Sequence, residues 1–251
     1  MSTRSDSTTK PVEVQAAPGR LVTVRRPVTP YWRAVGAIAW KDLRAEFRSR
    51  ELINSMLLFT LMTVMVFSLA LELDANARET IVTGVLWVTI VFAGQLGLSR
   101  SLAGEKDKGS LDALLLAPIA RSALFFGKMF GNLLFVLVIA LVLIVLLTVM
   151  FNITLVHPLL LLLVVLGSVG FTTVGTLLSS MSVHARSRET LLPILLMPVV
   201  LPIVISAVRA STAILNEMPS ADWMPWLQLL ALADVIFIAA SYALFDFVVE
   251  E

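Results

Sequence analysis

The chain has no cysteine among its 251 residues and only two histidines, His157 and His184. Without thiols it can form no disulfide, no thiolate metal centre and no redox pair of its own. Imidazole and thiolate are also common ligands of transition metals, so a metal site built from this chain alone would be short of ligands. We therefore predict that the chain holds no metal and binds no cofactor by itself.

Enzyme signatures are missing as well. Gly127-Lys128 is followed by methionine and lacks the earlier glycine of a G-x-x-x-x-G-K-[ST] loop, so the chain has no P-loop for ATP. His184 is followed by alanine, which excludes the H-E-x-x-H motif, and Gly167-Ser168-Val169-Gly170 does not match G-x-S-x-G. We predict that the protein is not an enzyme, and that any energy from ATP enters through a separate subunit.

Charge is scarce too, at 15% of residues, whereas 58% are hydrophobic and the mean hydropathy is +0.90. Soluble domains carry about 25% charged residues. Six apolar runs, each close to the ~20 residues that cross ~30 Å of hydrocarbon, occupy 53–71, 81–98, 129–151, 159–181, 191–208 and 227–249. We predict an all-α membrane protein whose residues 53–251 form six transmembrane helices in contact with lipid. The net charge of +1 says little about partners, and we predict none among nucleic acids.

Lysine and arginine are distributed unevenly around these runs. Segments 41–50, 100–128 and 182–189 hold four, five and two of them, whereas 72–80, 152–158 and 209–225 hold one, none and one. Basic residues accumulate on the cytoplasmic side of a membrane. The sequence therefore predicts a multi-pass protein of the inner (plasma) membrane with both termini and segment 99–128 in the cytoplasm.

Two different segments precede the first run. Residues 1–30 are polar and rich in proline and lack the apolar core of a signal peptide, so we predict a disordered cytoplasmic tail. Residues 31–52 predict a cytoplasmic amphipathic helix lying in the membrane interface, with basic residues crowding its other faces. Its apolar face is formed by Trp32, Val35, Ala39, Leu43 and Phe47.

Segment 99–128 is the longest charged insertion between two apolar runs, with five Lys/Arg and three Asp/Glu. It must lie outside the hydrocarbon, where a charge costs at least ~2.5–3.5 kcal/mol. Glu105 to Gly109 indicate a charged helix end, and a short amphipathic helix with Leu111, Leu114 and Leu115 on one stripe follows until Pro118. Such a helix can dock into a groove on another protein or lie on lipid headgroups.

A family resemblance favours the first alternative. Within 97–135 the matching residues are Gly109-Ser110-Leu111-Asp112-Ala113-Leu114-Leu115-Leu116-Ala117-Pro118, Arg121-Ser122, Gly127-Lys128 and Asn132-Leu133-Leu134-Phe135. This pattern resembles the signature of the CcmB permease family, the membrane subunit of the ABC-type complex of cytochrome c maturation. A looser form of it occurs in many ABC-2-type permeases, which place a connecting helix beside the ATPase where this chain has residues 31–52.

The resemblance implies partners and roles. A CcmA-like ATPase subunit would bind ATP and contact segment 99–128, here called the coupling loop, and CcmC-like and CcmD-like membrane subunits and a CcmE-like chaperone would handle haem. The leucines at 111, 114 and 115 would fill the groove, with Gly109 and Pro118 bounding the helix. Register would be set by Glu105, Asp107, Asp112 and Arg121. The output would be haem export or release of the haem-loaded chaperone. We do not expect His157, a turn residue before a proline, to bind haem.

Polar groups and prolines inside the runs are informative. Ser168, Thr172, Thr176 and Ser180 recur every four residues, which predicts a helix-packing seam in preference to a permeation path. Pro193, Pro198 and Pro202 predict a kinked or broken fifth helix.

Asp234 lies deep in the last run and is a candidate functional residue. Its carboxylate could serve a proton path, pair with Arg209, or be neutral and hydrogen-bonded, and we favour structural pairing. Two other functions remain open. One is an ABC-2-type permease for a drug, lipid or polysaccharide. The other is an ion-coupled secondary transporter that uses Asp234 as its proton site.

Overall fold

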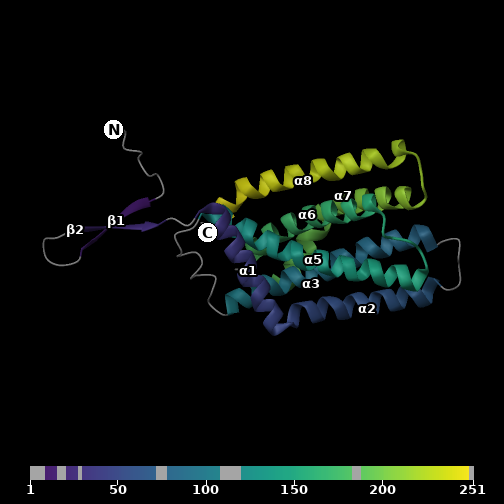
Figure 1. The fold of residues 1–251 in the computed structure, drawn as a ribbon, viewed down its shortest axis with the longest axis horizontal. Coiled ribbons are helices and arrows are strands. Elements are labelled where there is room, and N and C mark those ends of the chain that lie inside the picture. Colours follow the sequence, from purple (N-terminus) through teal and green to yellow (C-terminus); the bar gives the residue numbers. More distant parts are fainter. Residues whose placement is uncertain are drawn as a thin grey trace.

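The computed structural model describes residues 9–15, 21–27, 30–71, 78–107, 120–182 and 188–248. Its seven described helices are α1 (Tyr31–Ser49), α2 (Glu51–Leu71), α3 (Arg78–Asp107), α5 (Arg121–Phe151), α6 (Pro158–Ser182), α7 (Arg188–Leu215) and α8 (Ser220–Val248). Two strands, β1 (Thr9–Gln15) and β2 (Leu21–Pro27), precede them. The labels follow Figure 1.

Six of these helices, α2, α3 and α5 to α8, are long and apolar enough to cross a membrane. They lie side by side with alternating direction in one bundle (Figure 1). The predicted six-span, all-α fold is therefore confirmed. Hydrophobic length selects these segments because a helix satisfies all its backbone hydrogen bonds internally, as the bilayer requires.

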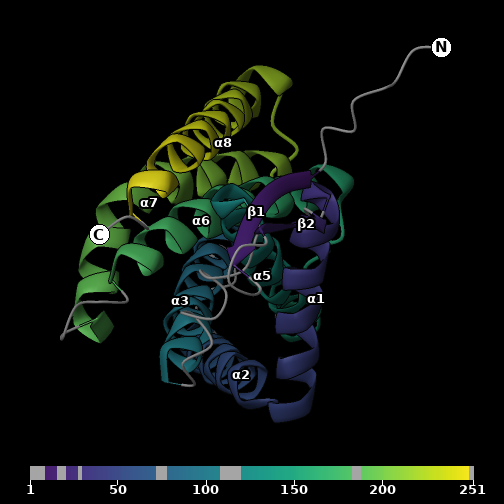
Figure 2. The same cartoon turned by 90° about the vertical axis from the view of Figure 1, so that its left-hand side faces the viewer.

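Helix α1 lies crosswise over one end of the bundle (Figures 1 and 2). At this end, here called the α1 end, α2 begins, α3 ends and α5 begins, whereas the α7–α8 turn lies at the opposite, far end (Figure 1). The apolar face predicted for α1 is divided between two surroundings. Val35 is buried in the protein beside Ala34 and Ile38, whereas Trp32 and Phe47 are exposed. The location of α1 in the membrane interface stays a prediction. Helical periodicity alone does not separate a face that meets protein from one that meets lipid.

The tail also differs from its prediction. Residues 9–15 and 21–27 form an antiparallel two-stranded sheet in which Val12 pairs with Val24 and Val14 with Val22. The prediction of disorder is therefore not met for these two strands. Alternating β-branched residues favour strands and pair well across a hairpin, a local signal that the overall polar composition concealed.

Helix α7 runs without interruption from Arg188 to Leu215 through its three prolines, so the broken-helix alternative is wrong. Leu196, Val200 and Ile203 are buried on its inner face, and α7 packs against both α6 and α8. Tertiary packing on this scale outweighs the loss of single backbone hydrogen bonds. A bend at the prolines stays a prediction.

Candidate functional site

Of the predicted coupling loop, the structure describes only the two ends, up to residue 107 and from residue 120. Glu105 and Asp107 belong to the last turn of α3 and Arg121 begins α5, and both helix ends lie at the α1 end of the bundle (Figure 1). The side chains of these three residues lie outside the described residues, as do Gly109, Leu111, Asp112, Leu114, Leu115 and Pro118 in their entirety. The structure therefore brings the two flanks to one end and leaves the docking helix a prediction.

Directly beside these flanks, α1 and α5 are joined by a buried ion pair. The Lys128 Nζ lies 2.8 Å from Oδ2 of Asp42, and the two side chains are only 5% and 11% exposed. Lys41, which is exposed, approaches the other carboxylate oxygen at 3.2 Å. A charge removed from water in this way is tolerated only with its partner in place. The pair therefore ties α1 to the bundle.

Glycine makes this contact close. A side-chain carbon at Gly127 would lie 2.7 Å from Cβ of Ile38 and 3.1 Å from the carbonyl oxygen of Val35. A side-chain carbon at Gly131, one turn further along α5, would lie 3.6 Å from Cβ of Asp42. Small residues four apart let two helices approach closely, so α1 rests on the backbone of α5. In the sequence, Gly127 and Lys128 attract notice as part of the family motif and as an incomplete P-loop, whereas Asp42 and Gly131 were missed. A small-x-x-x-small search would have found the two glycines.

Glu46 joins α1 to the first span. Its Oε1 accepts hydrogen bonds from the backbone N–H groups of Leu52 at 2.7 Å and Ile53 at 3.0 Å. Between the two helices Arg50 takes a left-handed conformation with φ 55°, which turns the chain from α1 into α2. A carboxylate at a helix N-terminus satisfies orphan donors and complements the helix dipole. Asp42 and Glu46, one turn apart, therefore fasten α1 to α5 and to α2.

The predicted polar seam of α6 is a packing surface. Ser168, Thr172 and Thr176 are all buried, and the Asn132 side chain of α5 donates to the Thr176 hydroxyl at 3.1 Å. Ser180 is half-buried and donates to the Leu177 carbonyl of its own helix. Ser168, Thr172 and Thr176 are thus packed inside the bundle, in agreement with the packing interpretation, and the Thr172 hydroxyl donates to the Ser168 carbonyl of its own helix at 2.7 Å.

Asp234 is buried, but not as predicted. Its carboxylate lies against Gly170 of α6 and near Ile203 of α7, and its Oδ1 has no hydrogen-bond partner among the described residues. Arg209 instead lies beside Trp226 at the far end, about 12 Å from Asp234 along α8 at 1.5 Å per residue. The predicted Asp234–Arg209 pair is therefore wrong, because the two side chains lie at different depths.

Two further hydrogen bonds close the far end of the bundle. The Trp87 indole N–H donates to the Ser211 hydroxyl at 2.9 Å, and the hydroxyls of Thr83 and Thr212 lie 2.7 Å apart. His157 is exposed there and accepts a hydrogen bond from the N–H of Leu159 at 3.3 Å, the geometry of a turn residue. The α3–α7 contact is thus anchored at the end opposite to the ion pair.

Comparison with known proteins covers nearly all of this architecture. The sequence model of the CcmB protein family matches residues 33–247, from the start of α1 to the end of α8. The chain belongs to the CcmB family. The predicted resemblance is confirmed, and the ion pair, the glycine contact and the α8 carboxylate all fall within the part of this CcmB-family chain that matches.

Individual relatives agree with the assignment. Heme exporter protein B of Pseudomonas aeruginosa is 27% identical over 188 residues, which cover 74% of this chain and 84% of that protein. Heme exporter protein B of Escherichia coli K12 is 28% identical over 102 residues, or 41% of this chain and 44% of that protein. The CcmB-family chain is thus similar to relatives that carry one and the same name.

Proposed function

We propose that this chain is the membrane-spanning subunit of a haem exporter that serves the maturation of c-type cytochromes. The observation that carries the proposal is the family match over residues 33–247, supported by relatives named Heme exporter protein B. Six apolar helices suit a multi-pass permease. The chain itself binds neither ATP nor a resident cofactor in this proposal; haem is handled by the assembled complex.

Energy enters through a separate ATPase subunit of the CcmA type. The chain has no P-loop of its own, and the stripe of Leu111, Leu114 and Leu115 suits a groove on another protein. Leucines would supply the buried anchor of that interface, and Glu105, Asp107, Asp112 and Arg121 its charged rim. The docked helix would sit between the ends of α3 and α5.

Movement of that loop would reach the bundle through α5 and α1. Lys128 lies seven residues into α5 from Arg121, and its buried pair with Asp42 makes α1 follow α5. Glu46 in turn holds the first turn of α2. Closely packed helices move together because a dense interior resists deformation. A displacement of the coupling loop would therefore move α5, α1 and α2 together.

The α1 end would face the cytoplasm, in the inner membrane. Two exposed strips on α1 support this orientation. Trp32, Trp40 and Phe47 form an aromatic strip, and Arg33, Lys41, Arg44 and Arg48 form a basic strip beside it. Aromatic rings settle at the membrane interface and basic residues on its inner side, attracted by anionic lipid. Both termini would then be cytoplasmic.

The decisive experiment is co-purification from native membranes in mild detergent. Replacing Leu114 and Leu115 with aspartate should abolish association with the ATPase while the variant stays in the membrane. Leu116→Asp is the control, since it adds an aspartate to the same segment outside the stripe and should keep the ATPase bound. If the double variant kept both its ATPase and its ATP turnover, docking through this stripe would be ruled out.

The same pull-down identifies the rest of the complex. We expect CcmC-like and CcmD-like membrane subunits and a CcmE-like chaperone to accompany the chain. Whether haem itself crosses or only the loaded chaperone is released is tested by following haem in reconstituted vesicles. Haem accumulation across the membrane without the chaperone supports export; its absence, with chaperone release intact, supports the second output. Recovery with partners of drug, lipid or polysaccharide transport would overturn the haem assignment.

A further inference from the structure

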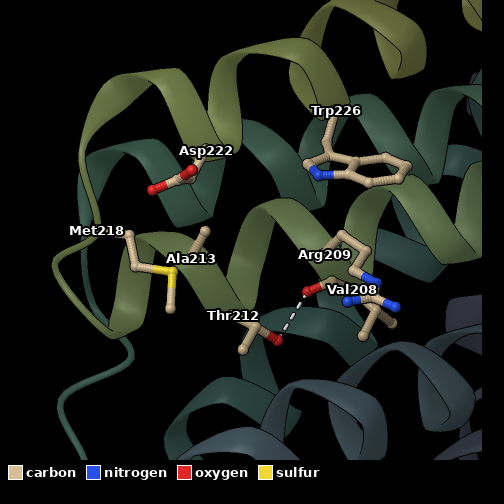
Figure 3. A pocket seen from close by; sticks show the side chains of 7 residues that line it. All are labelled: Val208, Arg209, Thr212, Ala213, Met218, Asp222 and Trp226. Atoms are coloured by element: carbon tan, nitrogen blue, oxygen red, sulfur yellow. Dashed lines mark hydrogen bonds between the residues drawn. The ribbon is translucent and has the colours of Figure 1, made fainter.

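A cavity of about 620 Å³ opens at the far end of the bundle, between the last turns of α7 and the first turns of α8. Figure 3 shows Asp222 and Met218 toward one end of it and Arg209 and Trp226 toward the other. Ligand pockets commonly have volumes of about 300–1,000 Å³. The cavity is therefore large enough for a small ligand or for the headgroup of a lipid.

Two opposite charges share this cavity without neutralising each other. Arg209 and Asp222 both line it, both are exposed, and they form no ion pair with each other in the described structure. A simple anion at Arg209 would be repelled by the nearby carboxylate, and a simple cation at Asp222 by the guanidinium. A ligand that carries both charges would satisfy both side chains at once.

The two charges also lie at different depths. Arg209 precedes the end of α7 at Leu215 by six residues, or roughly 9 Å along the helix axis. Asp222 belongs to the first turn of α8, next to the turn that joins the helices. The cation is thus deeper in the bundle than the anion. A phospholipid headgroup has the complementary order, since its phosphate is attached to the glycerol and its amine is the outermost group.

We propose that this cavity binds the phosphoethanolamine headgroup of a membrane aminophospholipid. The planar guanidinium of Arg209 donates paired hydrogen bonds to two oxygens of the phosphate. Asp222 accepts hydrogen bonds from the primary ammonium, which has three N–H donors. Trp226, at the Arg209 end, contacts the glycerol and the first acyl carbons, as amphipathic rings do at membrane interfaces, and Met218, at the Asp222 end, contacts the two methylene groups of the ethanolamine.

The chemistry makes a sharp distinction between headgroups. A choline ammonium is fully methylated and has no N–H to donate to Asp222, whereas a phosphoglycerol headgroup has no cation at all. Among lipids with the same acyl chains, the site should therefore bind the one with a phosphoethanolamine headgroup most tightly. Asp222 also complements the dipole of α8, a purely structural role that would produce no headgroup preference.

The test uses the full chain in detergent, with bound lipid counted by native mass spectrometry against phosphatidylethanolamine, phosphatidylcholine and phosphatidylglycerol of identical acyl chains. We expect about tenfold tighter retention of the ethanolamine lipid, the effect of ~1.4 kcal/mol. Asp222→Asn should remove the preference for ethanolamine over choline and keep phosphate binding. Arg209→Gln should weaken retention of all three lipids.

Matched controls change the same charges elsewhere. Glu217→Gln removes a carboxylate from the same turn outside the cavity, and Arg33→Gln removes an exposed guanidinium from α1; both should keep the preference. Equal retention of ethanolamine and choline lipids by the unaltered chain would overturn the proposal, as would a preference that survives Asp222→Asn. Free phosphoethanolamine that displaces the lipid at equal concentration would assign the cavity to a soluble zwitterion instead. None of these measurements requires transport, so they stand apart from the test of the ATPase partner.

Discussion

Helices α3 and α8 are equally apolar over the windows that can cross a membrane, yet 67% of the α3 window and only 17% of the α8 window is buried inside the protein. Helices α6 and α2 repeat the contrast, at 67% and 22%. Glycine separates the two groups: α3 has four and α6 has three, whereas α2 and α8 have none. Lipid tails are as apolar as leucine, so apolarity alone does not drive two helices together. Helices associate where small residues let their backbones approach each other closely.

Two contacts between α3 and α6 show how glycine does this. A methyl group added at Gly167 would overlap the ring of Trp87, and one added at Gly94 would overlap the ring of Phe171. Each large ring is completely buried because the opposite helix offers bare backbone. By contrast, α8 presents Leu232, Val235 and other large side chains outward, to lipid or to another subunit.

The largest loss of stability is expected at the α1 end, where the attachment of α1 to α5 depends on an ion pair as well as on glycine. Asp42→Asn should destabilise the protein by about 3–5 kcal/mol, because it leaves Lys128 buried without its countercharge. Denaturant unfolding in detergent micelles measures this. The double variant Asp42→Asn with Lys128→Met should recover most of the loss, and Lys41→Met should have little effect. A single variant as stable as the parent would show that the pair does not hold α1.

Overfilling the glycine contact tests the α3–α6 side of the contrast. Gly167→Leu should cost at least about 1–3 kcal/mol, since the added atoms meet the buried Trp87 ring. Ala239→Leu, at an exposed position on α8, should change stability by no more than about 0.5 kcal/mol. Thermal unfolding of the two variants in the same detergent compares them. Equal losses would mean that glycine does not distinguish the interior helices.

A smaller effect is expected from the hydrogen bond that closes α3 on α7. Trp87→Phe keeps a buried aromatic ring but removes the N–H that donates to Ser211 and part of the indole, at a cost of at least about 0.6 kcal/mol, the value typical of the hydrogen bond alone within membranes. Trp40→Phe, an exposed position on α1, should leave stability unchanged. Amide exchange near Ser211 measures the local opening. If Trp87→Phe and Trp40→Phe lowered the stability equally, the hydrogen bond from Trp87 to Ser211 would make no measurable contribution to the α3–α7 contact.

Asp234→Asn should have the smallest effect of all. Asparagine has nearly the shape of aspartate and carries no charge, and the described structure has no hydrogen-bond partner for Oδ1, so the substitution should not lower the stability. If a partner ATPase supplies the energy, the yield of c-type cytochromes should also be unchanged. Normal stability with lost activity would favour the ion-coupled transporter instead.

Hydropathy was enough to predict six spans, but it did not predict which of them form the interior. Ser168, Thr172 and Thr176 were predicted to pack, and they do, since small hydroxyls every four residues have few other uses in a membrane helix. Asp42 escaped prediction because one of two acidic residues on a helix with several basic ones forms no recognisable pattern. The Asp234–Arg209 pair failed because proximity to the same loop does not fix the depth of a side chain.

Segment length, apolarity and the family motif are properties of the chain read along one dimension, and they alone determined the membrane class, the number of spans and the CcmB assignment. Only the tertiary structure decided that Asp42 meets Lys128, that Val35 faces protein while Trp32 does not, and that Arg209 shares a cavity with Asp222. The reason is physical. Entry into a bilayer depends on each segment's own transfer free energy, whereas these contacts depend on how closely two backbones can approach.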